Sequence, residues 1–174
     1  MMEKELFFVL VVVCILTHCL RSVYELLKHR KLLQPNRLTF AVVFTDMALL
    51  WTSWFCLCRL DLGRINMAPV LQYFGILLVV TGILIFFSAL FTIKTLESYD
   101  GNLITTGIYS KIRHPMYLGF ILWLIGFPVV YGALFSFILS FLFIANILLW
   151  RYLEEIELEE RFPSYPDYKK TTLF

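Results

Sequence analysis

Long apolar runs separated by short polar segments dominate the pattern of this chain. No Asp, Glu, Lys or Arg occurs from Ile65 to Ile93, a run of 29 residues, or from His114 to Trp150, a run of 37 residues. A helix crosses a bilayer with about 20 consecutive apolar residues. Both runs therefore predict membrane helices and not the core of a water-soluble domain.

Five apolar segments are long enough to form helices, over residues 6–27, 38–58, 67–92, 115–131 and 133–152. The first contains Arg21, whose long side chain is expected to snorkel to the membrane surface. Pro115 suits the first turn of a helix because the N–H that it lacks would have no partner there. The stretch 127–132, with Pro128 and Gly132, predicts a tight turn between the last two helices.

The composition narrows the class of protein. Apolar and aromatic residues make up 60% of the 174 residues and charged residues 16%, against roughly 45–50% and 25% in soluble domains. This excludes a soluble domain, a disordered chain and a nucleic-acid-binding protein. The four cysteines lie in apolar stretches without the spacing of zinc ligands, so we interpret them as packing residues and predict no metal site; they are Cys14, Cys19, Cys56 and Cys58.

The predicted fold is all-α, a polytopic membrane protein with about five transmembrane helices, a C-terminal helical hairpin and a cytosolic cofactor pocket. We interpret residues 1–174 as a single membrane domain. Within it, residues 1–92 form three N-terminal transmembrane helices and residues 93–174 form a cofactor-binding catalytic unit.

Basic residues are distributed unevenly between the segments that connect these helices. With five spans, one side of the membrane receives eleven of them (Lys28, Arg30, Lys31, Arg37, Lys94, Lys111, Arg113, Arg151, Arg161, Lys169 and Lys170) and the other three (Lys4, Arg59 and Arg64). Cytosolic segments carry an excess of Lys and Arg. The sequence therefore predicts an N-terminus outside and a C-terminus in the cytosol, in the cell membrane of a prokaryote or the endoplasmic reticulum of a eukaryote.

Polar residues are dense in the segment 101–119, where a predicted cytosolic connection enters the membrane. It reads G-N-L-I-T-T-G-I-Y-S-K-I-R-H-P-M-Y-L-G. Arg113 and His114 precede the helix that begins at Pro115, and its free N–H groups and dipole favour an anionic ligand group such as a carboxylate. The alternative is a basic anchor at the level of the lipid headgroups.

Five glutamates follow the last apolar segment, in W-R-Y-L-E-E-I-E-L-E-E-R-F. We interpret the later three, Glu157, Glu159 and Glu160, as a solvated helical extension. Glu154 and Glu155 follow the span directly, where a carboxylate is costly unless it meets a cation or a donor. Candidate partners are Arg113, Arg151 and a cationic ligand.

Together these motifs resemble the superfamily of integral membrane methyltransferases that contains the isoprenylcysteine carboxyl methyltransferases and the phospholipid methyltransferases. The matching residues are L-I-T-T-G-I-Y at 103–109, R-H-P-M-Y-L-G at 113–119, a helical hairpin, and E-E-I-E-L from Glu154 with Phe162, Tyr165 and Tyr168. The resemblance covers residues 101–170. It implies a membrane methyltransferase that uses S-adenosylmethionine and a lipophilic acceptor drawn from the bilayer.

The same resemblance assigns the cofactor-binding residues. They are Gly101, Asn102, Leu103, Ile104, Tyr109, His114, Pro115, Met116, Tyr117 and Glu154. Their chemistry agrees with that assignment, since a carboxylate and tyrosine rings suit the sulfonium and ammonium of the cofactor. His114 or backbone N–H groups suit its carboxylate, and Leu103 and Ile104 are expected to line an adenine slot.

Two positions depart from the family pattern. Gly101 stands where members often carry a His. Trp150 stands where the prenylcysteine enzymes place the Arg that meets the substrate carboxylate, and the nearest Arg here is Arg151. One step along a helix turns a side chain by ~100°.

The sequence leaves the class of acceptor open between an anion and an amine, with Arg151, Glu155 and Arg113 as the candidate catalytic residues. An anionic acceptor needs only a cation, which Arg151 or Arg113 would supply. An amine needs a base to remove its proton, and Glu155 is the candidate. Arg151 and Glu155 lie four positions apart, so we expect an ion pair between them at rest.

Three alternative functions stay open beside an O-methyltransferase of the prenylcysteine type. They are a phospholipid N-methyltransferase, a related NADPH-dependent reductase of the sterol type, and a membrane scaffold without catalysis. Membrane lipids are the expected surroundings of all of them, and no nucleic acid is an expected partner.

His18 and Asp46 are a further polar pair within the apolar segments. Counted from the connection at 28–37, each lies ~14 Å into its helix, at 1.5 Å per residue. In antiparallel neighbours they would be level. We expect either a hydrogen bond that joins the first two helices or a functional site.

Overall fold

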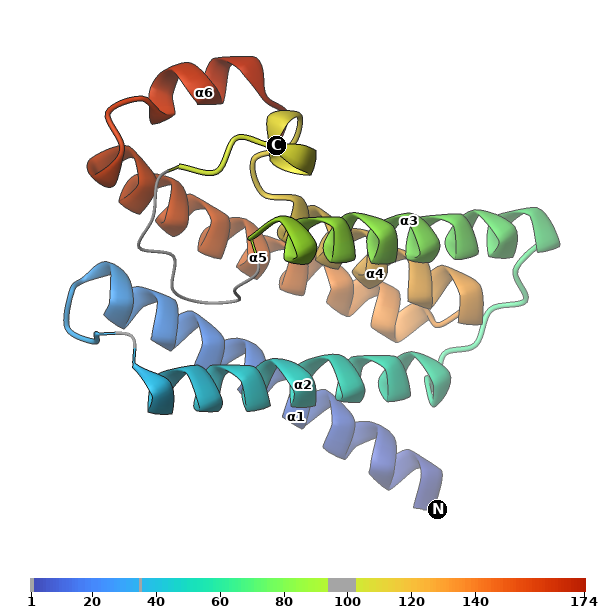
Figure 1. The fold of residues 1–174 in the computed structure, drawn as a ribbon. Helices are drawn as coiled ribbons and strands as arrows, with labels where there is room; N and C mark the ends of the chain where they lie inside the picture. Colours follow the sequence, from blue (N-terminus) through green and yellow to red (C-terminus); the bar gives the residue numbers. More distant parts are fainter. Residues whose placement is uncertain (1, 35, 94–102) are drawn as a thin grey trace.

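The structure is a computed structural model that describes residues 2–34, 36–93 and 103–174 (Figure 1). In these residues the chain forms α1 (Met2–His29), α2 (Arg37–Arg59), α3 (Pro69–Ile93), a 3-10 turn η1 (Gly107–Ser110), α4 (Pro115–Tyr131), α5 (Leu134–Arg161) and α6 (Tyr165–Thr171). The all-α polytopic fold is confirmed. Gly101 and Asn102, two of the predicted cofactor-binding residues, lie outside the described residues.

The five predicted apolar helices all form, with small differences at their ends. Four of them, α1, α2, α3 and α5, are long and apolar enough to cross a membrane, counted over the described ranges. α4 has the predicted bounds and only 17 residues, which is about 25 Å at 1.5 Å per residue. Its helix continues through Pro128 to Tyr131, so the turn to α5 is confined to Gly132 and Ala133.

α5 extends nine residues beyond the end of the predicted apolar segment at 152, to Arg161. Its extension forms ion pairs with the end of α1 and the connection after it: Lys28 Nζ lies 3.2 Å from Glu157 Oε2, and Lys31 Nζ lies 3.4 Å from Glu160 Oε2. The acidic run is therefore helical as predicted, but its carboxylates face basic residues and are not merely solvated.

The closest helix contact in the bundle joins α3 to α4 through two facing pairs of glycines. A Cβ added to Gly75 would lie 3.0 Å from the carbonyl oxygen of Gly126, and one added to Gly82 would lie 2.9 Å from that of Gly119. Small residues allow helix backbones to approach in lipid, where there is no hydrophobic drive for association. We call the two helices joined by this contact the α3–α4 unit.

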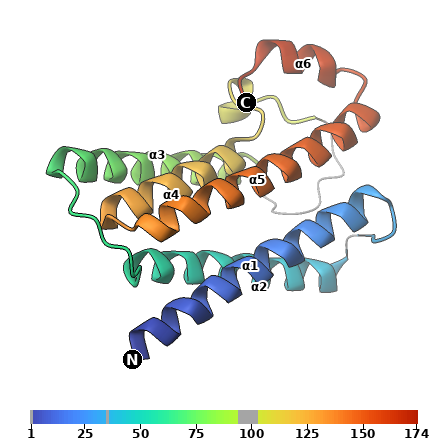
Figure 2. The ribbon, with the colours of Figure 1, turned by 180° about the vertical axis from the view of Figure 1, so that it is seen from behind.

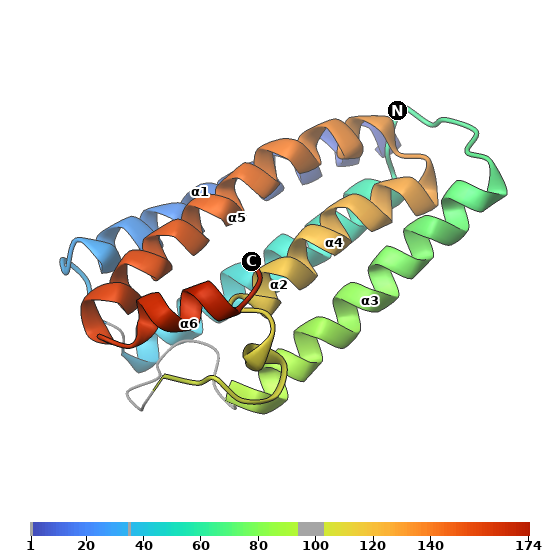
Figure 3. The ribbon, with the colours of Figure 1, turned by 90° about the horizontal axis from the view of Figure 1, so that it is seen from above.

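α4 lies between α3 and α5 in the view from above (Figure 3), and α1 packs against both α2 and α5. The view from behind shows the same order (Figure 2). The connection between α1 and α2, η1, the start of α4, the end of α5 and α6 all lie at one end of the bundle, which we call the polar end. The α4–α5 hairpin and residues 60–68 lie at the opposite end, the far end.

Candidate functional site

A cavity of about 430 Å³ lies between α2 and the α3–α4 unit and reaches the polar end. One part of its wall is apolar and aromatic: Phe40, Val43, Phe44, Met47, Ala48, Trp51, Phe86, Ile93 and Phe120. The other part is polar and consists of Arg21, Tyr109, Arg113, His114, Tyr117 and Glu154, with Pro115 and Met116 beside them. Such a wall suits a ligand with a charged head and an apolar body.

The polar part of the wall is built where three elements meet. His114 is the residue before the first turn of α4, which begins at Pro115 as expected. Tyr109 comes from η1, and Glu154 comes from α5 as it leaves the apolar span. The Glu154 side chain is 39% exposed, and its Oε2 lies 3.8 Å from His114 Nδ1. Glu154 also interacts with the Tyr117 side chain and with the charge of Arg21.

Tyr109 supplies a neutral aromatic wall. Tyr109 is buried, and its backbone carbonyl oxygen accepts a 2.5 Å hydrogen bond from the Tyr168 hydroxyl. This hydrogen bond connects η1 to α6. Burial raises the pKa of the Tyr109 hydroxyl well above its usual value, with the nearby Glu154 charge as a further cause. The phenol therefore stays un-ionised at neutral pH.

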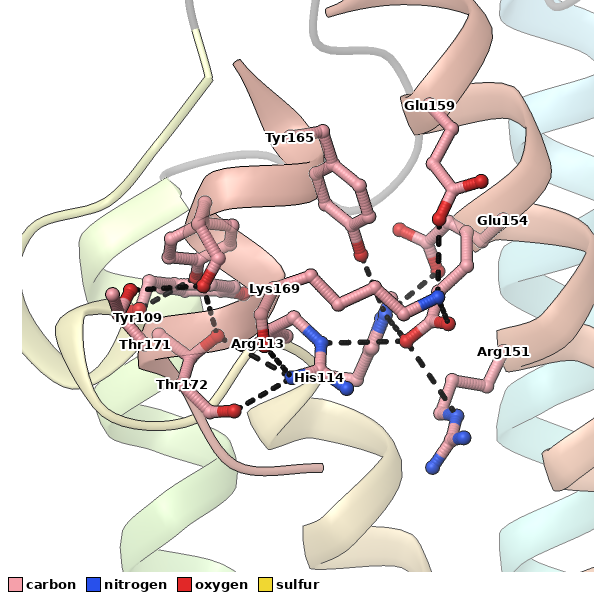
Figure 4. Close-up of polar contacts among 12 residues, drawn as sticks. Tyr109, Arg113, His114, Arg151, Glu154, Glu159, Tyr165, Lys169, Thr171 and Thr172 are labelled. Atoms are coloured by element: carbon pink, nitrogen blue, oxygen red, sulfur yellow. Dashed lines mark hydrogen bonds and ion pairs between the residues drawn. The ribbon is translucent and has the colours of Figure 1, made fainter.

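Glu155, next along α5, contacts basic side chains and is not among the residues that line the cavity. Figure 4 shows how Arg113, His114, Arg151 and Lys169 gather at this place. Lys169 Nζ lies 2.8 Å from its Oε2, while His114 Nε2 at 3.3 Å and Arg113 Nε at 3.4 Å share its Oε1. Arg151 Nε is 4.0 Å from the same oxygen, so the predicted pair between Arg151 and Glu155 forms. We call these four basic residues and Glu155 the Glu155 cluster.

α6 and the residues after it hold Arg113 in this cluster. Arg113 Nη1 donates to the carbonyl oxygens of Lys169 and Thr172, at 3.0 and 2.7 Å. The Arg113 backbone N–H also donates to the Leu173 carbonyl oxygen at 3.0 Å. The guanidinium of Arg113 is therefore largely committed to protein acceptors, although the residue also lines the cavity.

The hydrogen bond between Lys169 and Glu155 is the main cause that raises the pKa of the Lys169 ammonium above its usual value. Lys169 also reaches Glu159 Oε1 at 3.0 Å. The ammonium therefore remains charged across the neutral range and joins α6 to α5.

Most of the predicted cofactor-binding residues that the structure describes meet at the cavity: Tyr109, His114, Pro115, Met116, Tyr117 and Glu154. Leu103 and Ile104 are described but do not line it. Of the three candidate catalytic residues, Arg113 lines the cavity, whereas Arg151 and Glu155 do not. The Arg151 guanidinium lies 4.7 Å from the centre of the Phe174 ring.

Arg21 is the cavity residue that the sequence interpretation missed. It was expected to snorkel to the membrane surface, but its side chain is only 14% exposed and lines the cavity. Its Nη2 forms an ion pair with Glu25 one turn along α1, and its guanidinium lies 5.7 Å from the centre of the Trp150 ring. The sequence shows an Arg inside an apolar segment, which indicates a special role, but only the packing of the helices shows the direction of its side chain.

The expected hydrogen bond between His18 and Asp46 is absent. Neither ring nitrogen of His18 and neither carboxylate oxygen of Asp46 has a hydrogen-bond partner among the described residues. His18 stacks instead on Phe143, with ring centres 4.0 Å apart, and on Trp150 at 5.5 Å. Equal depth in two helices did not bring the side chains together because α1 turns His18 toward α5.

Comparisons with known proteins bear on the part of the chain that builds this site. Residues 70–164, more than half of the chain, match the phospholipid methyltransferase family. A protein-S-isoprenylcysteine O-methyltransferase of Schizosaccharomyces pombe is 35% identical over 78 residues, which are 41% of this chain and 31% of that protein. The enzyme of the same name in Saccharomyces cerevisiae is 37% identical over 71 residues, 40% of this chain and 28% of that protein.

The matched stretch is thus about a third of the length of these curated relatives. No solved structure matches the chain significantly. The family match covers ten of the 17 residues that line the cavity; they come from α3, from η1 and the residues before α4, from α4 itself and from α5. On the length of that match, the chain belongs to the phospholipid methyltransferase family.

Proposed function

We propose that this protein is an integral membrane methyltransferase that takes a methyl group from S-adenosylmethionine and transfers it to a lipophilic acceptor. The observation that carries the proposal is one cavity with a polar part, built by family-matched residues together with Arg21, and an apolar part beside it. S-adenosylmethionine supplies an electrophilic methyl group, whose C–S bond breaks with the electron pair left on sulfur as the acceptor atom forms its new bond.

The polar part of the cavity fits the charges of this cofactor. Glu154 offers a carboxylate to a cationic sulfonium or ammonium group. Tyr109 and Tyr117 line the same space, and the faces of aromatic rings attract such cations. His114 and the start of α4 offer donors for a carboxylate group. These residues would hold the cofactor, and Glu154 is the one whose charge matters most.

The apolar part of the cavity fits the body of a lipophilic acceptor. Phe40 and Phe44 line the cavity and are 41% and 55% exposed on the face of α2. In a bilayer that face meets lipid, so an acceptor would enter sideways past α2 without leaving the membrane. The cofactor would enter from the polar end, which the excess of basic residues assigns to the cytosol.

The Glu155 cluster has a positioning role in this proposal. Glu155 holds His114 by its Nε2, and the Tyr165 hydroxyl lies 3.3 Å from the same nitrogen. With Arg113 and Lys169 also on it, Glu155 is poorly placed to remove a proton from an amine acceptor. We therefore propose that it fixes the His114 ring at the cavity wall.

Because the cavity wall includes Arg21 of α1, the site needs residues 1–92 as well as the catalytic unit at 93–174.

The test is cofactor binding to the purified protein in lipid nanodiscs, measured by calorimetry with S-adenosylhomocysteine. We expect binding by the wild type, and a loss of about tenfold or more for Glu154→Gln, since a hydrogen bond to a charged group contributes about 1.5–3 kcal/mol. Glu160→Gln is the matched control, because that carboxylate lies outside the cavity on Lys31. Binding of NADPH in place of S-adenosylhomocysteine, or of neither, would overturn the proposal.

A further inference from the structure

Arg21 is unusual because its charge is buried and its hydrogen-bonding capacity is only partly used. Nε and Nη1 are buried and have no hydrogen-bond partner among the described residues, while Nη2 meets Glu25. A buried donor without a hydrogen-bond partner lowers the stability of the fold, and the cost is larger for a charged group. An ionisable residue at this depth in a membrane helix is retained for a function or paired in full.

The surroundings of Arg21 hold its guanidinium at the cavity. The central guanidinium carbon of Arg21 lies 5.2 Å from the centre of the Tyr24 ring, which is in the next turn of α1. It also lies 5.7 Å from the centre of the Trp150 ring of α5. Glu25 fixes one nitrogen from the same helix. These contacts hold the side chain at the wall of the cavity that Glu154 also lines.

The other two arginines near the site are less available to a ligand. Arg113 donates to two carbonyl oxygens and to Glu155. Arg151 does not line the cavity and contacts the ring of Phe174. Among the described residues, Arg21 is the arginine that both lines the cavity and keeps buried donors without an acceptor.

The geometry points to Arg21 as the residue that binds the head group of the acceptor, which would be an anion such as the carboxylate of a lipophilic acid. This inference rests on the proposed function, and it adds an acceptor-binding residue on α1, outside the family-matched residues 70–164. Charges within the cavity are then divided by sign. Glu154 attracts the cationic groups of the cofactor, and Arg21 attracts the anionic head of the acceptor, whose tail lies along the apolar wall.

The experiment compares three probes that differ only in their head group: terminally brominated dodecanoate, dodecylamine and dodecanol. Bromine quenches tryptophan fluorescence at short range, and Trp51 lies in the apolar wall of the cavity. Binding is measured in nanodiscs of neutral phosphatidylcholine, without cofactor. Trp51→Phe serves as the background, since it should lose the quenching that reports on the cavity.

We expect the wild type to bind the carboxylate at least about tenfold more tightly than the amine, as the loss of a charged hydrogen bond implies. The double variant Arg21→Met/Glu25→Gln removes both charges of the pair, and should abolish this preference without stranding Glu25. Lys28→Met is the matched control: it removes one positive charge from the same helix, outside the cavity wall, and should keep the preference.

Glu25→Gln separates a binding role of Arg21 from a structural one. Removing the competing carboxylate frees Nη2, so a binding role predicts tighter carboxylate binding than in the wild type. A purely structural role predicts weaker binding of all three probes. Arg21→Lys should keep part of the preference, because the charge remains while the guanidinium is lost.

A wild type without preference for the carboxylate, or a preference that survives in Arg21→Met/Glu25→Gln, would overturn the inference. The same samples are titrated with S-adenosylhomocysteine. If the preference fails while S-adenosylhomocysteine still binds, Arg21 is wrong and the proposed function stands. If the wild type does not bind S-adenosylhomocysteine, the proposed function falls, and the acceptor role of Arg21 falls with it.

Discussion

The far end of the helix bundle and the cavity at the polar end both contain shielded polar groups, but these groups are paired at the far end and only partly paired at the cavity. At the far end, Asp61 accepts from the Ser136 N–H and hydroxyl at 2.7 and 2.6 Å, and from the Gly63 N–H at 2.8 Å. Arg64 caps the same region by donating to the carbonyl oxygens of Tyr131 and Arg59. These groups are matched donor for acceptor.

At the cavity of the polar end, one buried group is left only partly matched. Arg21 keeps two donors without acceptors among the described residues, and the partly exposed Glu154 lines the same cavity. A polar cluster that satisfies itself stabilises a fold, whereas one that does not is costly and is kept for a ligand. The difference separates structure from function better than burial alone, because Asp61 and Arg21 are both largely shielded from solvent.

Removing Asp61 should have the largest effect on stability. Asp61→Ala leaves three donors near the α4–α5 hairpin without their acceptor, so we expect a loss of roughly 2–4 kcal/mol in the free energy of unfolding. Thermal unfolding in detergent measures it. Asp167→Ala is the control, since that carboxylate is 85% exposed on α6 and its loss should change stability by under about 0.5 kcal/mol. Equal effects of the two variants would erase the distinction between the ends.

The adjacent glutamates of α5 should divide into a structural and a binding residue. Glu155→Gln removes the charge shared by Lys169, Arg113 and His114, and we expect a loss of about 2 kcal/mol in stability. Glu154→Gln should leave the unfolding temperature nearly unchanged while it weakens binding of S-adenosylhomocysteine. Unfolding scans and calorimetry on both variants check this, and the reverse order would contradict it.

Removing the ion pair between Arg21 and Glu25 beside the cavity should cost little stability. For Arg21→Met/Glu25→Gln we expect a change between zero and a gain of about 1 kcal/mol, because replacing a buried ion pair by groups of similar volume is often neutral or stabilising. The measurement is the same thermal scan, with Arg21→Met alone for comparison, which strands Glu25 and should be less stable. A large loss of stability in the double variant would show that this pair is structural, like the hydrogen-bonded groups around Asp61 at the far end.

The smallest effect is expected for the ion pair between Lys31 and Glu160 at the rim of the polar end. Both side chains are exposed, at 84% and 62%, and exposed pairs typically contribute under about 1 kcal/mol. Lys31→Gln should therefore shift the unfolding temperature barely beyond error and leave probe binding unchanged. A loss as large as that of Glu155→Gln would show that the rim holds the cavity open.

Sequence reasoning succeeded where one local property decides the structure. Charge-free runs predicted the helices because a bilayer tolerates only apolar segments that satisfy their own backbone. Pro115 marked the start of α4, and the spacing of four along α5 predicted the contact between Arg151 and Glu155. The helical extension of α5 was predicted, but its ion pairs to Lys28 of α1 and to Lys31 beyond α1 were not, because they join segments far apart in the sequence.

Side-chain direction was decided by packing. The sequence by itself determined which segments are helical, which end of the chain carries the motif of the phospholipid methyltransferase family, and that Glu154 and Glu155 stand at a membrane boundary. Only the tertiary structure decided that Glu154 lines the cavity and that Glu155 meets Arg113 before α4 and Lys169 of α6. Neighbouring residues on a helix point ~100° apart, and their partners come from distant segments. The tertiary structure also decided that Arg21 lies inside the bundle, because its guanidinium packs against the Trp150 ring of α5, a residue far away in the sequence.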